Sequence, residues 1–398
     1  MKKFNFFKTL SLVALTSTLL VQGCKKDPVI VPVAQTVVLK TDIVVAQTLK
    51  DLGTGIDYIV EGNLDVKGVV LTIEPGVTIQ FAQNASLRMV DFGAMKAIGT
   101  AANPILFTGK QSTKGFWKGL IFESTNNTEN QLENCIVEYA GEASAYSTTI
   151  KGAVLAGNFL SKPVLLSLKN VTIQHNSNNG LYIDDQATLS AFDNCTITDN
   201  AFPIKAMEEG INSIDNDNKM TGNASDVVEW ANYGGSDVSS NTKINTLSIP
   251  IRFTGDDLKV AKGATLTISA GTKMQMAQNT QMSAYNGGII VMDGTLASPI
   301  IFDGVQKTRG FWKGIVSYGA GSSVTMKYVQ ANDGGDLALG LNAMIGQYVT
   351  GSVLNVTNCK MANFSKYGLS YNSKSTFNAD IATSNTCDGG GTGCILKL

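Results

Sequence analysis

Three observations in the sequence predict a parallel β-helix, an all-β solenoid in which each coil of short strands stacks on the previous one. The first is a long internal repeat, and the second is a succession of short stretches that alternate apolar and polar residues. The third is the composition, which is rich in Gly, Asn, Thr, Ser and Val, with 40 glycines and only 8 prolines among 398 residues. Such a composition favours strands and tight turns over helices.

The internal repeat relates the two halves of the chain. Four motifs of the first half recur in the second, each displaced by 195 residues. The motif pairs are Leu71–Gly76 with Leu266–Gly271, Ala82–Asn84 with Ala277–Asn279, Pro104–Phe107 with Pro299–Phe302, and Gly115–Gly119 with Gly310–Gly314. A single displacement without gaps indicates that one structural unit is present twice.

A finer period divides each unit into coils. Val77–Phe81 alternates apolar and polar residues, as a strand with one buried face does. Asn170–Ile173 recurs 24 residues later as Asn194–Ile197, and most strand-like stretches are closed by Gly, Asn or Asp. Short strands that return every 20 to 24 residues fit a solenoid whose adjacent coils lie about 4.8 Å apart.

Three of these motifs carry a resemblance to a known group. Leu71–Val77, Asn103–Gly109 and Phe116–Phe122 resemble right-handed parallel β-helix proteins of the pectin-lyase-like superfamily. More narrowly, they are similar to exported bacterial lipoproteins of that group that carry the unit singly or in tandem. The resemblance covers roughly residues 50–200 and 245–385. It implies a right-handed solenoid with two pseudo-repeats, and it implies no activity, because the shared motifs belong to the fold.

The N-terminus has the features of a secretory signal peptide. Three lysines precede Leu10–Val21, an uncharged apolar stretch. This stretch is too short for a membrane-spanning helix, which needs about 20 apolar residues. Val21–Cys24 resembles the lipobox of bacterial lipoproteins, which implies cleavage before Cys24 and lipidation of its thiol. In Gram-negative lipoproteins an Asp directly after the lipidated cysteine resembles a signal for retention in the inner membrane. This chain has Lys25 at that position. We therefore expect an exported, lipid-anchored protein of the outer membrane, and Lys25–Asp27 resembles a tag for the cell surface.

These features give an expected organisation in five parts. They are a signal peptide at 1–23, a tether at 24–45, a first β-helix unit at 46–205, a connecting segment at 206–245, and a second unit with a C-terminal cap at 246–398.

The charge of the chain bears on its partners. The formal net charge is −1, and it becomes −4 once the three lysines of the signal peptide are removed. A chain of this charge with three arginines and no basic cluster is not expected to bind nucleic acid. The expected partners are the membrane, through the lipid anchor, and a polysaccharide or a surface protein.

The two Gly-Phe-Trp-Lys-Gly motifs are the first candidate ligand-binding sites. Trp117 and Trp312 would stack on sugar rings if they faced solvent. The alternative, which we favour, is that both rings pack against a neighbouring coil.

Four acids are a candidate metal site, with calcium as the expected cofactor. Asp184 and Asp185 precede Glu208 and Glu209 by about one coil, so the four carboxylates would stack on one edge. The alternative is an ordinary solvated edge, which we favour. Asp256–Asp257 is a weaker candidate, and Asp215–Met220 begins like a calcium loop but places Lys219 where an oxygen ligand is needed.

His175 is the only histidine and a candidate general base. A glycoside hydrolase of this fold would also carry further acid motifs with a charge-stabilising partner, which are absent here. The arginines Arg88, Arg252 and Arg309 are scattered along the chain. We therefore interpret His175 as a turn residue.

The cysteines fall into three classes. Cys24 is the lipidation site. Cys135, Cys195 and Cys359 each follow an Asn at the start of a strand, which indicates one repeated inward-facing position. Cys387 and Cys394 flank a flexible Gly-rich loop, and a disulfide between them is expected in an oxidising compartment.

The sequence leaves three functions open. The favoured one is a non-catalytic surface lipoprotein that presents a rigid β-helix for adhesion or glycan binding. The second is a calcium-dependent polysaccharide lyase or glycosidase that uses the four acids, and the third is a structural envelope protein. No catalytic residue is assigned, since the fold alone does not imply activity.

Overall fold

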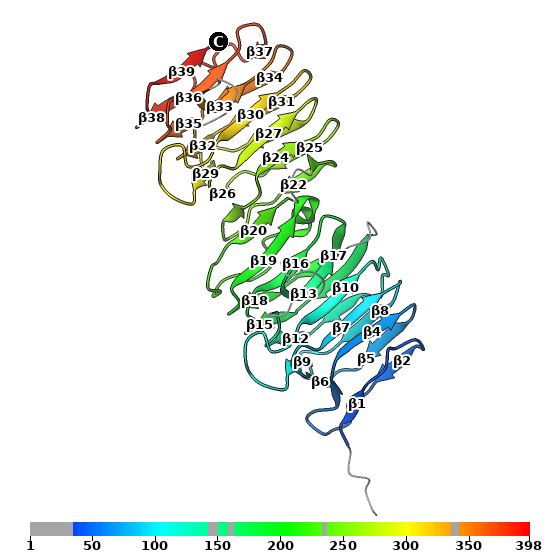
Figure 1. Ribbon diagram of the computed structural model, residues 1–398. Helices are drawn as coiled ribbons and strands as arrows, with labels where there is room; N and C mark the ends of the chain where they lie inside the picture. Colours follow the sequence, from blue (N-terminus) through cyan, green and yellow to red (C-terminus); the bar gives the residue numbers. More distant parts are fainter. Residues whose placement is uncertain (1–34, 142–149, 158–162, 233–236, 336–341) are drawn as a thin grey trace, which may run out of the picture. The chain divides into compact units, whose positions relative to one another are not determined.

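The structure is a computed structural model that describes residues 35–141, 150–157, 163–232, 237–335 and 342–398 (Figure 1). The predicted signal peptide, the predicted lipidation site Cys24 and most of the predicted tether lie outside these residues. Gln35–Leu398 forms one compact unit.

Alternating apolar side chains place one face of each short strand in the interior, and backbone hydrogen bonds join each strand to the same strand of the next coil. The longest stack, called the long sheet here, has 13 strands among the described residues. They are β4 (Asn63–Lys67), β7 (Ser86–Val90), β10 (Gly119–Glu123), β13 (Gly152–Gly157), β16 (Asn179–Ile183), β19 (Phe202–Met207), β20 (Val228–Ala231), β23 (Ile251–Phe253), β26 (Lys273–Met276), β29 (Ile300–Gly304), β32 (Val329–Asn332), β35 (Lys360–Ala362) and β38 (Thr386–Asp388).

Two further sheets complete the coils of the first half. Sheet N1 consists of β1 (Val37–Leu39), β3 (Tyr58–Val60), β6 (Thr78–Phe81), β9 (Ile105–Gly109), β12 (Cys135–Glu138), β15 (Thr172–Gln174) and β18 (Thr196–Thr198). Sheet N2 consists of β2 (Gln47–Leu49), β5 (Val70–Ile73), β8 (Ala94–Ile98), β11 (Gln131–Glu133), β14 (Val164–Lys169) and β17 (Ala187–Asp193).

Two other sheets complete the coils of the second half. Sheet C1 consists of β21 (Asp237–Val238), β24 (Asp257–Val260), β27 (Gln281–Tyr285), β30 (Gly314–Tyr318), β33 (Ala343–Gln347), β36 (Tyr367–Tyr371) and β39 (Gly393–Lys397). Sheet C2 consists of β22 (Thr242–Ile244), β25 (Thr265–Ile268), β28 (Ile289–Asp293), β31 (Ser323–Lys327), β34 (Val353–Thr357) and β37 (Thr376–Phe377). One short 3-10 helix, η1 (Glu208–Ser213), follows β19.

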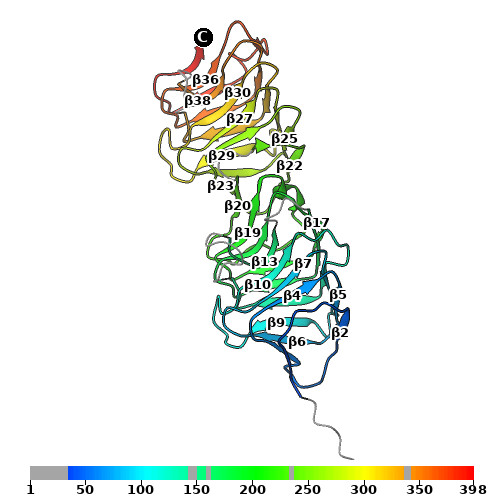
Figure 2. The same cartoon turned by 45° about the vertical axis from the view of Figure 1, so that its right-hand side comes forward.

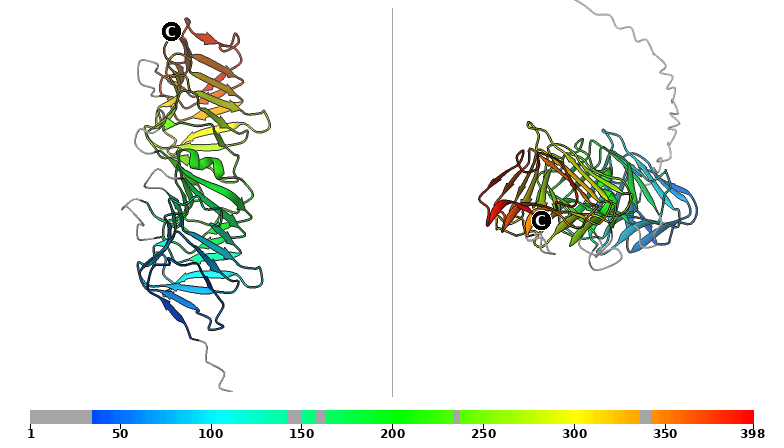
Figure 3. Two further views of the ribbon diagram at one scale, coloured as in Figure 1. Left: turned by 90° about the vertical axis from the view of Figure 1, so that its right-hand side faces the viewer. Right: turned by 90° about the horizontal axis from the view of Figure 1, so that it is seen from above.

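These pairings confirm the prediction of an all-β parallel solenoid. Successive strands of the long sheet pair in parallel, as β10 with β13 and β19 with β20 do, and the described coils amount to about 13 turns. The stacked coils are visible in Figures 2 and 3. None of the helices in the described part of the chain is long and apolar enough to span a membrane.

The long sheet takes different strands of the repeated unit in the two halves. In the first half it contains β10, which follows the Gly-Phe-Trp-Lys-Gly motif, whereas in the second half it contains β29, which precedes the motif. The segment 206–245 makes this change, because β19 pairs directly with β20 and the strands of sheets C1 and C2 begin after β20. Surface positions that correspond in the sequence repeat therefore lie on different sheets.

The interior repeats from coil to coil. Cys135, Cys195 and Cys359 are all buried, as expected for inward-facing residues. Cys135 and Cys195 lie at strands of sheet N1, whereas Cys359 precedes β35 of the long sheet. Asn176, Asn200 and Asn223 form a ladder, in which the Asn176 and Asn200 amides each donate to the next Asn at 2.8 and 3.1 Å. Such ladders satisfy polar groups that the solenoid buries at its corners.

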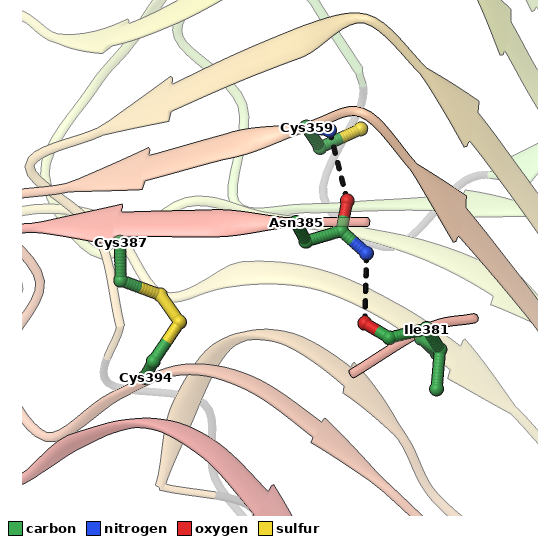
Figure 4. Close-up of a disulfide and its surroundings, with 5 residues drawn as sticks. All are labelled: Cys359, Ile381, Asn385, Cys387 and Cys394. Carbon is green, nitrogen blue, oxygen red and sulfur yellow. Dashed lines mark hydrogen bonds between the residues drawn. A yellow bond between two sulfur atoms is a disulfide. The ribbon is translucent and has the colours of Figure 1, made fainter. Parts of the chain in front are cut away.

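The C-terminal end of the solenoid is closed. Cys387 and Cys394 are joined by a disulfide, with their Cα atoms 5.4 Å apart (Figure 4). Beside them, the Asn385 amide donates to the Ile381 carbonyl at 2.8 Å and accepts from the Cys359 amide at 2.8 Å. Ile381 is buried in the core, so apolar packing and a covalent bond hold the last coil together.

Candidate functional site

The structure places Trp117 and Trp312 in the core instead of on the surface. Both side chains have no exposed surface. Trp117 lies flat against Phe81, with ring centroids 3.9 Å apart, and its indole N–H donates to the Glu138 carbonyl at 2.8 Å. A fully buried ring offers no face to a sugar. The two motifs therefore position their tryptophans for packing, and the ligand-binding role considered from the sequence has no surface to act on.

The lysine of each motif reaches the outer face of a sheet. Lys118 donates to the Asn63 side chain at 3.0 Å, and Asn63 also accepts from the Ser86 hydroxyl at 2.9 Å. In the second half burial raises the pKa of the Asp257 carboxyl, and the positive charge of the corresponding Lys313 opposes that shift in part. The motif thus buries an aromatic ring and presents a cation on the surface beside it.

The four predicted metal-binding acids are only partly brought together. Asp185, Glu208 and Glu209 line one cavity of about 760 Å³, next to Asp237 and the hydroxyls of Ser239 and Ser240. Asp184 does not line that cavity, although it is almost fully buried at the end of β16.

Hydrogen bonds already engage the carboxylates of Glu209 and Asp185. The Glu209 carboxylate accepts from the backbone N–H groups of Ser239 and Ser240 at 2.7 and 3.1 Å. The Asp185 carboxylate accepts from the backbone N–H of Gln186 at 2.8 Å. No three His, Cys, Asp or Glu side chains within the described ranges are arranged to hold a metal ion.

His175 lies in a surface turn, away from the acid cavity. Its Nδ1 is 2.6 Å from the Asp199 carboxylate, and its ring stacks on Tyr139 at 5.6 Å between centroids. Lys114 occupies the other oxygen of Asp199 at 2.6 Å. This arrangement ties the turn to the next coil, and His175 does not line the acid cavity.

The arginines serve local contacts on separate coils. Arg88 makes two hydrogen bonds with Asp65, at 2.8 and 2.9 Å. Arg252 donates to Gln275 at 3.0 Å, and Arg309 donates to Asn363 at 3.3 Å. None of these contacts involves the acid cavity.

A row of stacked, partly exposed tyrosines lies along sheet C1. Tyr285 and Tyr318 stack with centroids 5.2 Å apart, and Tyr318 and Tyr348 stack at the same distance. All three are partly exposed. Lys259 places its ammonium 5.6 Å from the centroid of the Tyr285 ring. We call Tyr285, Tyr318, Tyr348 and Lys259 the tyrosine strip.

The strand register explains the strip. Tyr285 is paired with Tyr318 across β27 and β30, so their side chains leave the sheet on the same face and one above the other. Tyr348 follows β33, and its backbone N–H donates to the Ser317 carbonyl at 2.9 Å. Aromatic pairs on adjacent strands stabilise a sheet. The exposed faces and edges of their rings are large enough to contact a ligand.

Polar groups of the same sheet face continue the strip. The half-buried Asp257 carboxylate accepts from the Ser283 hydroxyl at 3.1 Å and from the Gln281 amide at 3.4 Å. Burial raises the pKa of Asp257 above its usual range, against the lowering effects of Ser283 and Lys259. Aromatic rings beside a carboxylate, an amide and a cation form the kind of mixed surface on which sugars bind.

The strip belongs to the second half alone. At the displacement of 195 residues, Tyr285 and Tyr318 correspond to Val90 and Glu123. Sequence reasoning did not find the strip, because Tyr285, Tyr318 and Tyr348 are separated by unequal coil lengths of 33 and 30 residues. The difference between the two copies at these positions is the signal that would have identified it.

Comparisons with known proteins give little further information. No protein-family model matches the chain, and no curated protein matches it. One similar solved structure is the crystal structure of the Agl-KA catalytic domain, with 12% sequence identity, a TM-score of 0.29 and coverage of 85% of this chain. This chain spans 62% of the length of that structure. A similarity at this level supports no argument about activity.

Proposed function

We propose that this protein is an exported lipoprotein of the outer membrane, displayed at the cell surface, that binds a polysaccharide or surface glycan without cleaving it. The lipobox ending at Cys24 supports the anchor. The closed parallel solenoid supports a rigid display role, since every described coil is hydrogen-bonded to its neighbours. The tyrosine strip supports glycan binding.

The observation that carries the binding proposal is the stack of three partly exposed tyrosines beside Lys259 and Asp257. Tyrosine offers a broad ring at a low cost in conformational entropy, and its neighbours here supply hydrogen-bond donors and acceptors. The first copy of the repeat has Val90 and Glu123 where the second has Tyr285 and Tyr318, so the repeated scaffold does not require the strip.

The test is a binding screen of the acylated chain against a panel of polysaccharides, repeated with the double variant Y285A/Y348A. Loss of binding by about tenfold or more is expected, since aromatic residues at binding surfaces commonly contribute more than 1 kcal/mol each. The control is Y328A, because Tyr328 is also partly exposed and has Lys327 5.9 Å from its ring, yet lies outside the strip. Equal losses in both variants would contradict the proposal.

The acid cavity favours a second candidate, a calcium-dependent polysaccharide lyase or glycosidase. Asp185, Glu208 and Glu209 are close enough to line one cavity, and crowded carboxylates attract hard cations. A lyase would generate unsaturated sugar ends that absorb ultraviolet light, and a chelator would abolish the signal. Turnover that E208Q removes would replace the binding proposal with this one.

A structural envelope role is the third outcome. It would be supported if the unmutated chain bound and cleaved none of the polysaccharides. In that case the tyrosine strip would serve the stability of sheet C1.

A further inference from the structure

The exposed apolar side chains of the described residues are concentrated near the N-terminal end of the solenoid. Ten large apolar residues are clearly exposed, and five of them lie between residues 37 and 92. They are Val37, Val38, Val44, Val45 and Phe92. Scattered single apolar residues need no explanation, but a cluster of this kind marks an interaction surface.

Val44, Val45 and Phe92 follow one edge of the first three coils, whereas Val37 and Val38 belong to β1 of sheet N1. Val44 and Val45, 61% and 74% exposed, form the turn between Ile43 and β2, and Ala46 extends the exposed run. A run of consecutive exposed apolar residues is unusual unless it has a function. In the next two coils the corresponding turns, between the long sheet and sheet N2, contain Val69 and Phe92.

Backbone contacts place these turns one above the other. The Lys67 N–H donates to the Ile43 carbonyl at 3.0 Å, and the Ala94 N–H donates to the Val69 carbonyl at 2.9 Å. A side chain at Gly93 would lie 2.0 Å from the Val66 carbonyl, so only glycine fits there. This tight turn carries Phe92, which is 57% exposed. We call the exposed residues Val44, Val45 and Phe92 the apolar edge. Val69, in the turn between them, is partly buried against the core.

The first coil is also the terminal coil of the solenoid. A cavity of about 250 Å³ there is lined by Val38, Leu39, Ile43, Val44 and Val45 together with the polar residues Lys40, Thr41, Asp42 and Gln47. The acid nearest to the run, Asp42, is paired with Lys67 at 2.7 Å. The exposed apolar surface therefore has little unpaired negative charge beside it in the first coil, whereas Asp91 is exposed next to Phe92.

We propose that the apolar edge contacts the lipid bilayer in which the protein is anchored. The inference rests on the proposed lipidation of Cys24. Ten residues separate Cys24 from Gln35, and a chain of that length spans at most about 36 Å. The apolar edge is thus part of the solenoid that the anchor keeps near the membrane. Interfacial apolar side chains enter the boundary between headgroups and acyl chains, and Asp91 limits the contact to that depth.

This contact has a consequence for display. A single lipid anchor on Cys24 leaves the solenoid free to turn against the membrane. A second contact at the first coil fixes its orientation, so the tyrosine strip, which begins more than 200 residues further along the chain at Tyr285, is held in a constant position for a ligand.

The test introduces one exposed tryptophan and measures how strongly brominated lipids quench its fluorescence. The native residues Trp117, Trp230 and Trp312 have no exposed surface, so acyl-brominated lipids should quench them little. The full chain carrying Val45→Trp is reconstituted through its lipid into vesicles of such lipids. The matched control is Leu296→Trp, because Leu296 is 83% exposed and lies on a coil of the second half.

We expect V45W to be quenched about twofold or more relative to L296W, because interfacial side chains reach acyl-chain depth. In the unmutated chain, amides of residues 36–50 should exchange with deuterium more slowly on vesicles than in the unlipidated C24S variant, while residues 289–296 should not change. Equal quenching of V45W and L296W would overturn the contact. A blue shift of V45W that depends on protein concentration without vesicles would overturn it in favour of a second copy of this chain.

Failure of the anchor is a separate result. Mass spectrometry of the N-terminal peptide and flotation of the chain with vesicles report lipidation directly. An unmodified chain that does not float would refute both the anchor and the contact. A modified chain that floats, with no difference between V45W and L296W, would refute the contact alone.

Discussion

Lys114 forms a 2.6 Å ion pair with Asp199, a residue 85 positions later in the sequence. The same ammonium donates to the Asp199 backbone carbonyl at 2.8 Å. The loop that precedes the first Gly-Phe-Trp-Lys-Gly motif is thereby attached to a turn three strands further along sheet N1. Trp117, three residues after Lys114, owes its fixed position to packing in the interior rather than to this exposed contact.

The first prediction concerns Trp117. W117A should destabilise the protein by about 3–5 kcal/mol, because it removes a buried ring and leaves a cavity. W117F keeps a ring against Phe81 but loses the hydrogen bond to the Glu138 carbonyl, so its loss should be smaller. Urea unfolding followed by circular dichroism measures both. A loss below about 1 kcal/mol for W117A would show that the ring is not packed as described.

The second prediction is a pH dependence at Asp65. Burial raises the pKa of Asp65, but the hydrogen bond and charge of Arg88, together with Lys67, outweigh it and hold the pKa below its usual value. A carboxyl with a lowered pKa in the folded state contributes stability above the unfolded pKa of about 3.9. That contribution is lost as the pH falls through the folded pKa.

The variant D65N isolates this contribution. At pH 7 it should lower the free energy of unfolding by about 1–2 kcal/mol, after allowance for screening at the partly exposed Arg88. The difference between D65N and the unmutated protein should shrink as the pH falls below about 4. The control is D42N, whose carboxyl is 41% exposed in its pair with Lys67 and should matter less. A D65N effect that is constant from pH 7 to the acid limit would contradict the assignment.

How far the sequence predicts the fold is clear from particular elements. Val77–Phe81 and the turn glycines define strands and coils, because alternation and turn chemistry are local. The burial of Cys135, Cys195 and Cys359 could be predicted for the same reason. The path of 206–245 could not be predicted, because η1 and β20 depend on packing against the preceding coil.

The candidate site was harder to predict than the fold. The aromatic residues that stand out in the sequence, Trp117 and Trp312, are buried, since the motif turns their rings inward. Tyr285, Tyr318 and Tyr348 became neighbours only through the strand register. Register depends on the length of each loop, and coils of 33 and 30 residues hide the alignment.

The third prediction concerns Asp257. Its raised pKa means that the folded state binds the proton more tightly than the unfolded state. Its contribution to stability is therefore present below the unfolded pKa of about 3.9 and is lost as the pH rises through the folded pKa. At pH 7, D257N should leave the free energy of unfolding unchanged or raise it slightly. This gain should become smaller at low pH. Thermal unfolding at several pH values measures this, and a clear destabilisation at pH 7 would contradict the described environment.

The last prediction concerns the thiols. Burial raises the pKa of Cys135 to about 12 and the pKa values of Cys195 and Cys359 to about 11. Because the thiolate is the reactive form, these residues should resist alkylation at pH 8 in the folded protein. In the C24S variant we expect no labelled cysteine in the native state and three after unfolding without reductant, counted by mass spectrometry. Five labelled cysteines after unfolding would show that Cys387 and Cys394 are not bonded. Labelling in the native state would show instead that these interior positions are open to solvent.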